Sequence, residues 1–178
     1  IGQAGTETAY TYEVCQNGKG RLCKVQTLNS VINHNYDALG RIISEENIIS
    51  GNSFTALYKY DRRGNMLEIS YPEGGKTLYN YNSAGLLETL SYFEPEVATP
   101  FLIVEDTDYA PTGAFSYLNF SNNSESFYTY NPDQLYRLAN IRTTAPNATL
   151  QNIAYTYDPV GNITQIIDTS QTNTAKTV

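Results

Sequence analysis

The two cysteines are the residues whose spacing most directly suggests chemistry. Cys15 and Cys23 flank segment 17–20, whose Asn-Gly pair and second glycine are typical of a tight turn. In a hairpin symmetric about Lys19 the two thiols face each other, and a disulfide would contribute roughly 2.5 kcal/mol on the chain-entropy model. It would also imply an oxidising compartment. The alternative is two buried free thiols. Without a second pair or a nearby histidine, the spacing does not indicate a metal site.

The other reactive side chains do not form a catalytic set. His34 is the sole histidine, so no serine or cysteine elsewhere can belong to a histidine-based triad without it. The acidic run at Glu105, Asp106 and Asp108 lacks the alternating ligands and bidentate glutamate of a calcium loop. We therefore expect no enzymatic activity, no catalytic residue, no cofactor and no metal.

Composition narrows the class of protein further. Sixteen tyrosines, no tryptophan and abundant threonine, isoleucine, asparagine and glycine favour β-structure. A formal net charge of −7 argues against nucleic acid or an anionic membrane surface as a partner. No apolar run approaches the roughly 20 residues of a membrane span. Because the chain begins at Ile1, we interpret it as a piece of a longer protein.

The main pattern is a Tyr-x-Tyr unit that recurs along most of the chain. We call its second position the anchor and its first the leading position. The anchors are Tyr12, Tyr36, Tyr60, Tyr81, Tyr109, Tyr130 and Tyr157. The leading positions hold Tyr10, His34, Tyr58, Tyr79, Thr107, Tyr128 and Tyr155, so His34 is most simply a substitute for tyrosine. Alternation along a strand places both residues of a unit on one face of a sheet.

A turn follows each anchor. The next residue is usually Asp or Asn, whose side chain can accept hydrogen bonds from backbone amides ahead of it, and a glycine that can adopt positive φ comes three residues later. These turn residues are Asp37 and Gly40, Asp61 and Gly64, Asn82 and Gly85, Gly113, and Asp158 and Gly161. Glu13, Ala110 and Tyr136 depart from the pattern. Each unit is thus predicted to be a strand, a tight turn and a second strand.

These units predict an all-β chain of tandem β-hairpins in a curved antiparallel sheet. Residues 1–9 are a lead-in, and repeats occupy 10–92 and 109–168. Between the two blocks, residues 93–108 contain two prolines and are expected to be an irregular insertion, either a longer loop or a strand out of line. Residues 169–178 are expected to be a frayed tail or connector.

The repeat resembles the YD repeat of RHS (rearrangement hotspot) proteins. The stretches "YDALGRI" (36–42) and "YTYDPVGNIT" (155–164) are close to the family pattern, and "CQNGKGRLC" looks like a cysteine-flanked turn of some bacterial members. In RHS proteins, Tc-toxin components and teneurins, such repeats form a long β-sheet that spirals into a hollow shell. The resemblance covers residues 10–168 and implies that this chain is a strip of such a wall. Bacterial members enclose a C-terminal toxic polypeptide.

This resemblance leads to two functional hypotheses. The first is a non-enzymatic shell segment of a secreted or cell-surface bacterial protein, whose partners are neighbouring repeats and an enclosed toxin polypeptide. Its tyrosines would form a ladder with packed rings and solvated hydroxyls. The second is a tyrosine-rich β module that binds carbohydrate or a cell-surface protein. The shell protease signature requires leucine where Asn162 follows Asp158-Pro159-Val160-Gly161, so that role is not transferred. Exposed strand edges predict edge-to-edge self-association of the fragment.

Overall fold

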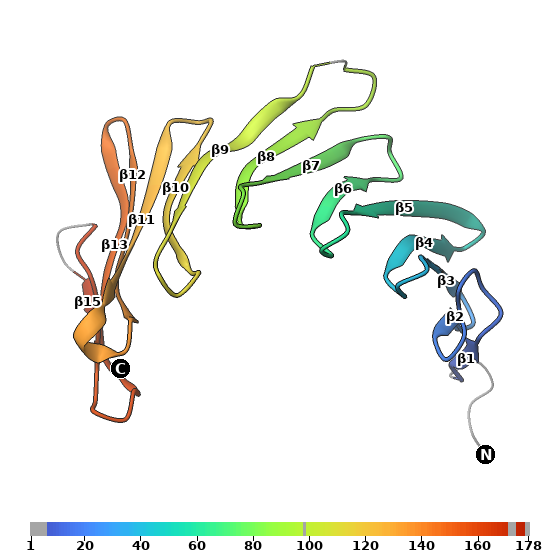
Figure 1. Cartoon of the computed structure of the whole chain (residues 1–178), viewed down its shortest axis with the longest axis horizontal. Coiled ribbons are helices and arrows are strands. Elements are labelled where there is room, and N and C mark those ends of the chain that lie inside the picture. The colour runs from blue at the N-terminus through green and yellow to red at the C-terminus, as the bar shows by residue number, and fades with distance from the viewer. Residues whose placement is uncertain (1–6, 98, 171–173, 177–178) are drawn as a thin grey trace. The chain divides into compact units, whose positions relative to one another are not determined.

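The computed structural model describes residues 7–97, 99–170 and 174–176, and this part of the chain is all β apart from one short 3₁₀ helix (Figure 1). The strands from β1 to β8 are Ala9–Tyr12, Leu22–Gln26, Ser30–Tyr36, Ile42–Ile49, Asn52–Tyr60, Met66–Ser70, Lys76–Tyr81 and Leu87–Phe93. From β9 to β15 they are Phe101–Tyr109, Phe115–Phe120, Ser124–Asn131, Arg137–Ala145, Ala148–Tyr157, Ile163–Asp168 and Thr174–Lys176. The 3₁₀ helix η1 is Pro132–Gln134.

In the described residues, fifteen strands form one open sheet whose strand order is the chain order. Consecutive strands pair antiparallel from β1 to β7 and from β9 to β15. Examples are β3 with β4 and β4 with β5, which lie side by side in Figure 1. The prediction of tandem antiparallel hairpins is therefore confirmed. The chain divides into two compact units, Ile1–Tyr79 with Tyr92–Pro100 and Asn80–Ser91 with Phe101–Val178.

The hairpin turns share one hydrogen-bonding pattern. At the first of them the Asp37 amide donates to the Arg41 carbonyl at 2.9 Å, and the Gly40 amide donates to the Asp37 carbonyl at 3.0 Å. Gly40 has φ of +82°, a conformation that glycine adopts without steric cost. The same pair of backbone bonds recurs in the turns that begin at Asp61, Tyr71, Asn82, Ala110 and Asp158.

A β-bulge lies at the anchor tyrosines. Strand register shifts between Asn35 and Tyr36, between Lys59 and Tyr60, and between Thr156 and Tyr157. A bulge adds a residue to one strand and increases the local twist. A type I turn followed by a left-handed glycine produces this bulge, so the turn chemistry of the repeat also sets the position of the anchor ring.

The sheet has one layer in both units, and its side chains are mostly half-buried. In the second half of β5, Ala56, Tyr58 and Tyr60 on one face are half-buried, whereas Leu57 and Lys59 between them are exposed. The buried hydrophobic side chains among the described residues are Cys23, Tyr36 and Val104. Contacts between adjacent hairpins must therefore supply much of the stability that a closed core supplies elsewhere. None of the described residues forms a helix suited to crossing a membrane.

Two boundary expectations need correction. Residues 93–108 are not an irregular insertion throughout, because β9 occupies Phe101–Tyr109 and pairs with β10 in regular sequence order. The apolar run from Phe101 favours a strand, and the prolines confine the irregular segment to the residues before it. In the predicted tail, 174–176 form β15 against β14, while 171–173 and 177–178 lie outside the described residues, as do 1–6 of the lead-in.

The segment between the cysteines is not a hairpin symmetric about Lys19. Instead it contains two successive turns, in which the Gly18 amide donates to the Cys15 carbonyl and the Arg21 amide donates to the Gly18 carbonyl. Asn17 has φ of +52° and Gly20 has φ of +71°, so each turn contains a left-handed residue. Cys15 therefore lies in the loop between β1 and β2, and Cys23 lies within β2.

Candidate functional site: the joint between successive hairpins

Five of the anchor tyrosines join their hairpin to the one before it. The Tyr60 hydroxyl donates to the Ile42 carbonyl at 2.9 Å, across the strand pairing of β4 and β5. Equivalent bonds join Tyr36 to Leu22 at 2.5 Å, Tyr109 to Leu87 at 2.7 Å, Tyr130 to Phe115 at 2.8 Å and Tyr157 to Leu138 at 2.8 Å. The expectation of solvated hydroxyls is therefore wrong for these tyrosines. Their hydroxyls satisfy carbonyl groups near the start of the preceding return strand.

The acceptor has the same place in the repeat at three of the five joints. Ile42, Leu87 and Phe115 each follow the preceding anchor by six residues, beyond its turn. The spacing is eight for Leu138, because the preceding turn contains the 3₁₀ helix η1. Left-handed Leu135 and Tyr136 complete that turn where other repeats use glycine. The longer turn therefore preserves the same contact at the next joint.

The leading positions are more varied. Tyr58, Tyr79, Tyr128 and Tyr155 are half-buried, and burial raises the pKa of Tyr58 and of Tyr79. Thr107 takes the place of a tyrosine and donates its hydroxyl to the Leu87 carbonyl. Tyr10 and Tyr12 lie on the edge strand β1 and are 59% and 56% exposed. Tyr81 is the anchor of β7.

His34 is held by the opposite strand. Its Nε2 lies 3.1 Å from Glu45 Oε2, and the two residues are directly paired between β3 and β4. Its Nδ1 is buried without a hydrogen-bond partner in the structure. This contact explains how histidine is accommodated at a leading position, and it does not bring a hydroxyl or thiol nucleophile to the ring.

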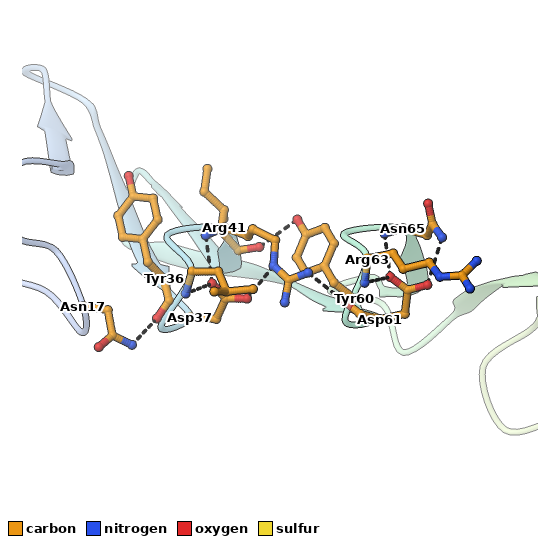
Figure 2. Close-up of polar contacts among 10 residues, drawn as sticks. Asn17, Tyr36, Asp37, Arg41, Tyr60, Asp61, Arg63 and Asn65 are labelled. Atoms are coloured by element: carbon orange, nitrogen blue, oxygen red, sulfur yellow. Dashed lines mark hydrogen bonds and ion pairs between the residues drawn. The ribbon is translucent and has the colours of Figure 1, made fainter. Parts of the chain in front are cut away.

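The turn carboxylates bind backbone amides (Figure 2). Asp37 Oδ1 accepts from the amides of Leu39 and Arg41 at 2.9 Å each. Asp61 Oδ1 accepts from Arg63 and Asn65, and Asn82 uses its amide oxygen to accept from Ala84 and Leu86. Asp158 Oδ1 accepts from Gly161 and Asn162. A carboxylate and a carboxamide can therefore fill the same structural role.

These hydrogen bonds favour the ionised aspartates. The backbone amide of Arg41 is the largest influence that lowers the pKa of Asp37. At Asp158 the side chain of Asn162 has the largest effect and again lowers the pKa. At Asp61 burial raises the pKa, but hydrogen bonds led by Asn65 outweigh it, and the net pKa is lowered. Each carboxylate thus already accepts hydrogen bonds from groups of its own turn.

Arginine after the turn glycine was not among the predicted site residues. Arg41 Nε donates to Asp37 Oδ2 at 2.6 Å, while its Nη1 donates to the Asp61 carbonyl in the next hairpin at 2.7 Å. Its guanidinium lies 4.7 Å from the centre of the Tyr60 ring (Figure 2). One side chain therefore contacts two turns and the anchor between them. The recurring Gly-Arg pair was the sequence signal.

An arginine also lies beside the anchor ring at two other joints in the described residues. Arg137 lies 5.7 Å from the centre of the Tyr157 ring and donates to the Asp158 carbonyl at 3.1 Å. Arg21 lies 5.7 Å from the centre of the Tyr36 ring, and its guanidinium fills the space beside Gly40 that a β-carbon would need. Glycine at these turns therefore serves both backbone conformation and the approach of the neighbouring arginine.

Cys15 and Cys23 form a disulfide with an S–S distance of 2.02 Å. The loop that contains Cys15 contacts the end of β3, where the Tyr36 amide donates to the Gln16 carbonyl at 3.1 Å. Asn17 Nδ2 donates to the Tyr36 carbonyl at 2.9 Å. The first joint thus has a cross-linked loop in addition to its tyrosine and arginine.

The acidic residues do not assemble a metal centre among the parts of the chain that the structure describes. Asp106 pairs with Asn119 and Asp108 pairs with Tyr117, across β9 and β10. Glu125 accepts from the Tyr117 hydroxyl at 2.6 Å, and this hydrogen bond raises the pKa of Tyr117 to about 12. The contacts of these acidic residues thus lie between paired or neighbouring strands of the sheet.

The fold and the joints define a tandem β-hairpin repeat, and comparison with known proteins shows which repeat it resembles. The model of the RHS Repeat family matches residues 36–76, which confirms the resemblance to RHS proteins. The crystal structure of TcdB2-TccC3-Cdc42 superposes with a TM-score of 0.78 at 19% identity, over 93% of this chain and 9% of that chain. The crystal structure of TcdB2-TccC3 gives the same values.

A third similar structure is the Tc holotoxin pore of Photorhabdus luminescens with a TccC3 mutation. It has a TM-score of 0.78 at 18% identity and covers 97% of this chain and 9% of that chain. The chain thus spans less than a tenth of the length of these structures, and their likeness establishes its fold. No curated protein matches the sequence.

Proposed function

We propose that this chain is a segment of an RHS-type shell wall that encloses a C-terminal toxin or effector polypeptide. The repeated joint is the observation that carries this proposal. An anchor tyrosine links successive hairpins at five joints, and an arginine lies beside the tyrosine at three of them. Because these contacts do not need a closed core, they can extend a one-layered wall by any number of hairpins. Such a wall has two faces, one of which can be turned toward cargo.

The remaining features agree with a structural role outside the reducing cytosol. The disulfide suits a secreted or cell-surface bacterial protein. The described side chains include no cluster of the kind that holds a metal, and the single histidine is engaged with a glutamate. We propose that the segment is non-enzymatic. Its partners would be neighbouring repeats and the enclosed polypeptide.

Two residues of β5 offer a matched test of encapsulation. Phe54 lies on the tyrosine face of the strand and Leu57 on the opposite face, and they are similarly exposed at 47% and 48%. Either residue can be replaced by photo-reactive benzoylphenylalanine in the complete parent protein. Illumination should attach the C-terminal polypeptide to one position and not to the other. Attachment at neither position, or equally at both, would contradict an enclosing wall.

A tyrosine-rich binding module is the second candidate, and Tyr10 and Tyr12 are the most exposed tyrosines of the described residues. Aromatic faces of this kind could bind carbohydrate or a cell-surface protein. A glycan array probed with the chain separates the two functions. A shell segment should bind no defined glycan. A binding module should bind one, and should lose it in the Tyr10→Ala and Tyr12→Ala variants while it remains folded.

A further inference from the structure

Beyond the residues that pair with β2, the end of β3 is hydrogen-bonded to the loop between β1 and β2. The pairing of β2 with β3 runs from Lys24–Asn33 to Gln26–Val31 and stops short of Tyr36. Beyond it, the Gln16 carbonyl and the Asn17 side chain engage the amide and the carbonyl of Tyr36. Both backbone groups of this anchor are therefore satisfied by the loop.

The disulfide determines where this loop lies. It links Cys15, the residue before Gln16, to Cys23 in β2. The Cys15 amide also lies 3.1 Å from Cys23 Sγ, and Gly18 packs against both sulfur atoms. The loop is otherwise held by turns of its own and by hydrogen bonds to β3, which include one from the Gln16 amide to Asn35 Oδ1 at 3.3 Å. The disulfide is the one covalent bond that holds the loop in position, and it can be reduced.

We propose that the Cys15–Cys23 disulfide is a redox-sensitive tie that holds the first two hairpins together at Tyr36. The reductant is a small thiol. Its thiolate attacks Cys15 Sγ rather than Cys23 Sγ, because Cys15 is half-buried whereas Cys23 is only 2% exposed. The S–S bond breaks, a mixed disulfide forms at Cys15, and Cys23 leaves as a thiolate beside the Cys15 amide.

A second equivalent of thiol completes the reduction. It attacks the sulfur of the thiol adduct, so Cys15 leaves as a thiolate and the small molecule is released as its own disulfide. Both cysteine thiolates then take up protons, and two thiols of the reductant are consumed for each disulfide opened. The loop is then free to leave β3, and the backbone of Tyr36 becomes accessible to water.

This response is local to one joint. The sequence contains only two cysteines, so every other joint depends on noncovalent contacts that a thiol does not reduce. The joint at Tyr157, for example, uses the Leu138 carbonyl and Arg137. The chain would therefore loosen at its first joint in a reducing compartment while the remaining hairpins stay folded. This inference does not require an enclosed polypeptide and can fail separately from the proposed function.

Hydrogen exchange of single amides tests the tie in the full chain. Glutathione at neutral pH should speed exchange at the Tyr36 amide by at least about tenfold, as expected when a short cross-linked loop is released. Exchange at the Tyr157 amide should stay unchanged. A Cys15→Ser, Cys23→Ser double variant should show the fast rate without glutathione. Unchanged Tyr36 exchange in protein with two titratable thiols would overturn the proposal.

Two loop variants separate docking of the loop from the cross-link itself. Asn17→Asp keeps the disulfide but removes the amide donor to the Tyr36 carbonyl, so it should speed Tyr36 exchange in oxidised protein. Gln16→Ala keeps the backbone carbonyl that the Tyr36 amide uses and should leave exchange unchanged. Mass spectrometry of briefly treated protein should place the glutathione adduct on Cys15. An adduct mainly on Cys23 would overturn the proposed order of attack.

Discussion

The guanidinium of Arg41 lies 4.7 Å from the centre of the Tyr60 ring, although the two residues belong to successive hairpins. The same guanidinium donates to the Asp37 carboxylate of its own turn and to the Asp61 carbonyl of the next. A planar group with several fixed donors can make these contacts together, whereas an ammonium group presents a single point. This joint and the tyrosine hydroxyl beside it lead to testable consequences.

Arg41→Ala should lower the free energy of unfolding by about 2 kcal/mol, because it removes a cation–π contact and charge-assisted hydrogen bonds from a partly buried site. Arg41→Lys should recover less than half of the loss. Chemical denaturation measures both. Arg63→Ala is the control, since Arg63 is exposed and contacts the Asp61 side chain through its backbone amide. An equal loss in the control would show that the joint has no special role.

Tyr60→Phe should destabilise the chain by about 1–2 kcal/mol, because the Ile42 carbonyl loses its hydroxyl donor. Tyr58→Phe, two residues earlier on the same face of β5, should change stability by less than about 0.5 kcal/mol. No hydrogen bond of the Tyr58 hydroxyl occurs within the described part of the chain. Urea denaturation of the two variants provides the comparison. Equal effects would mean that the anchor hydroxyl is not a joint contact.

Acid should weaken the turns. The pKa values of Asp37, Asp61 and Asp158 are lowered in the folded chain, so the folded state binds protons less readily than the unfolded state. Their contribution to stability is complete above the ordinary aspartate pKa of about 3.9 and is lost as the pH falls through the lowered values. The urea midpoint should therefore change little above about pH 4 on account of these groups and should fall as the pH is lowered further.

A triple variant, Asp37→Asn, Asp61→Asn and Asp158→Asn, should show a smaller fall in the urea midpoint. Asn82 already accepts the equivalent pair of amides through a carboxamide oxygen, so the turn itself survives this change. Some acid dependence should remain, because the pKa values of Glu46, Glu68 and Asp168 are also lowered. An undiminished fall would assign the acid sensitivity to those groups alone.

Gly18→Ala should interfere with the disulfide. A β-carbon at this position would lie 2.5 Å from Cys23 Sγ and 2.6 Å from Cys15 Sγ, which requires the loop to move. We expect a loss of about 1–3 kcal/mol and an increase in free thiols after air oxidation, measured by thiol labelling. Gly20→Ala is the matched change, because its β-carbon would meet nothing within 4 Å. It should cost about 1 kcal/mol through its positive φ and leave the thiols oxidised.

The repeat units and their turns could be predicted from the sequence because their causes are local. An aspartate, a glycine three residues later and an alternating strand determine each hairpin within about ten residues. The run from Phe101 was assigned to an insertion because two nearby prolines interrupt the rhythm, yet its β-branched and apolar residues still form β9. Proline restricts the residues beside it and does not prevent a strand from starting after it.

The contacts at the joints could be identified only from the tertiary structure. The sequence shows that Tyr60 and Arg41 recur in the repeat. It does not show that the Tyr60 hydroxyl donates to the Ile42 carbonyl or that the Arg41 guanidinium donates to the Asp61 carbonyl. These contacts connect residues 18 and 20 positions apart. They depend on strand register, on the bulge at each anchor and on the twist that it adds, and register is a property of paired strands. The sequence thus determined the hairpin unit, whereas strand pairing determined how one hairpin holds the next.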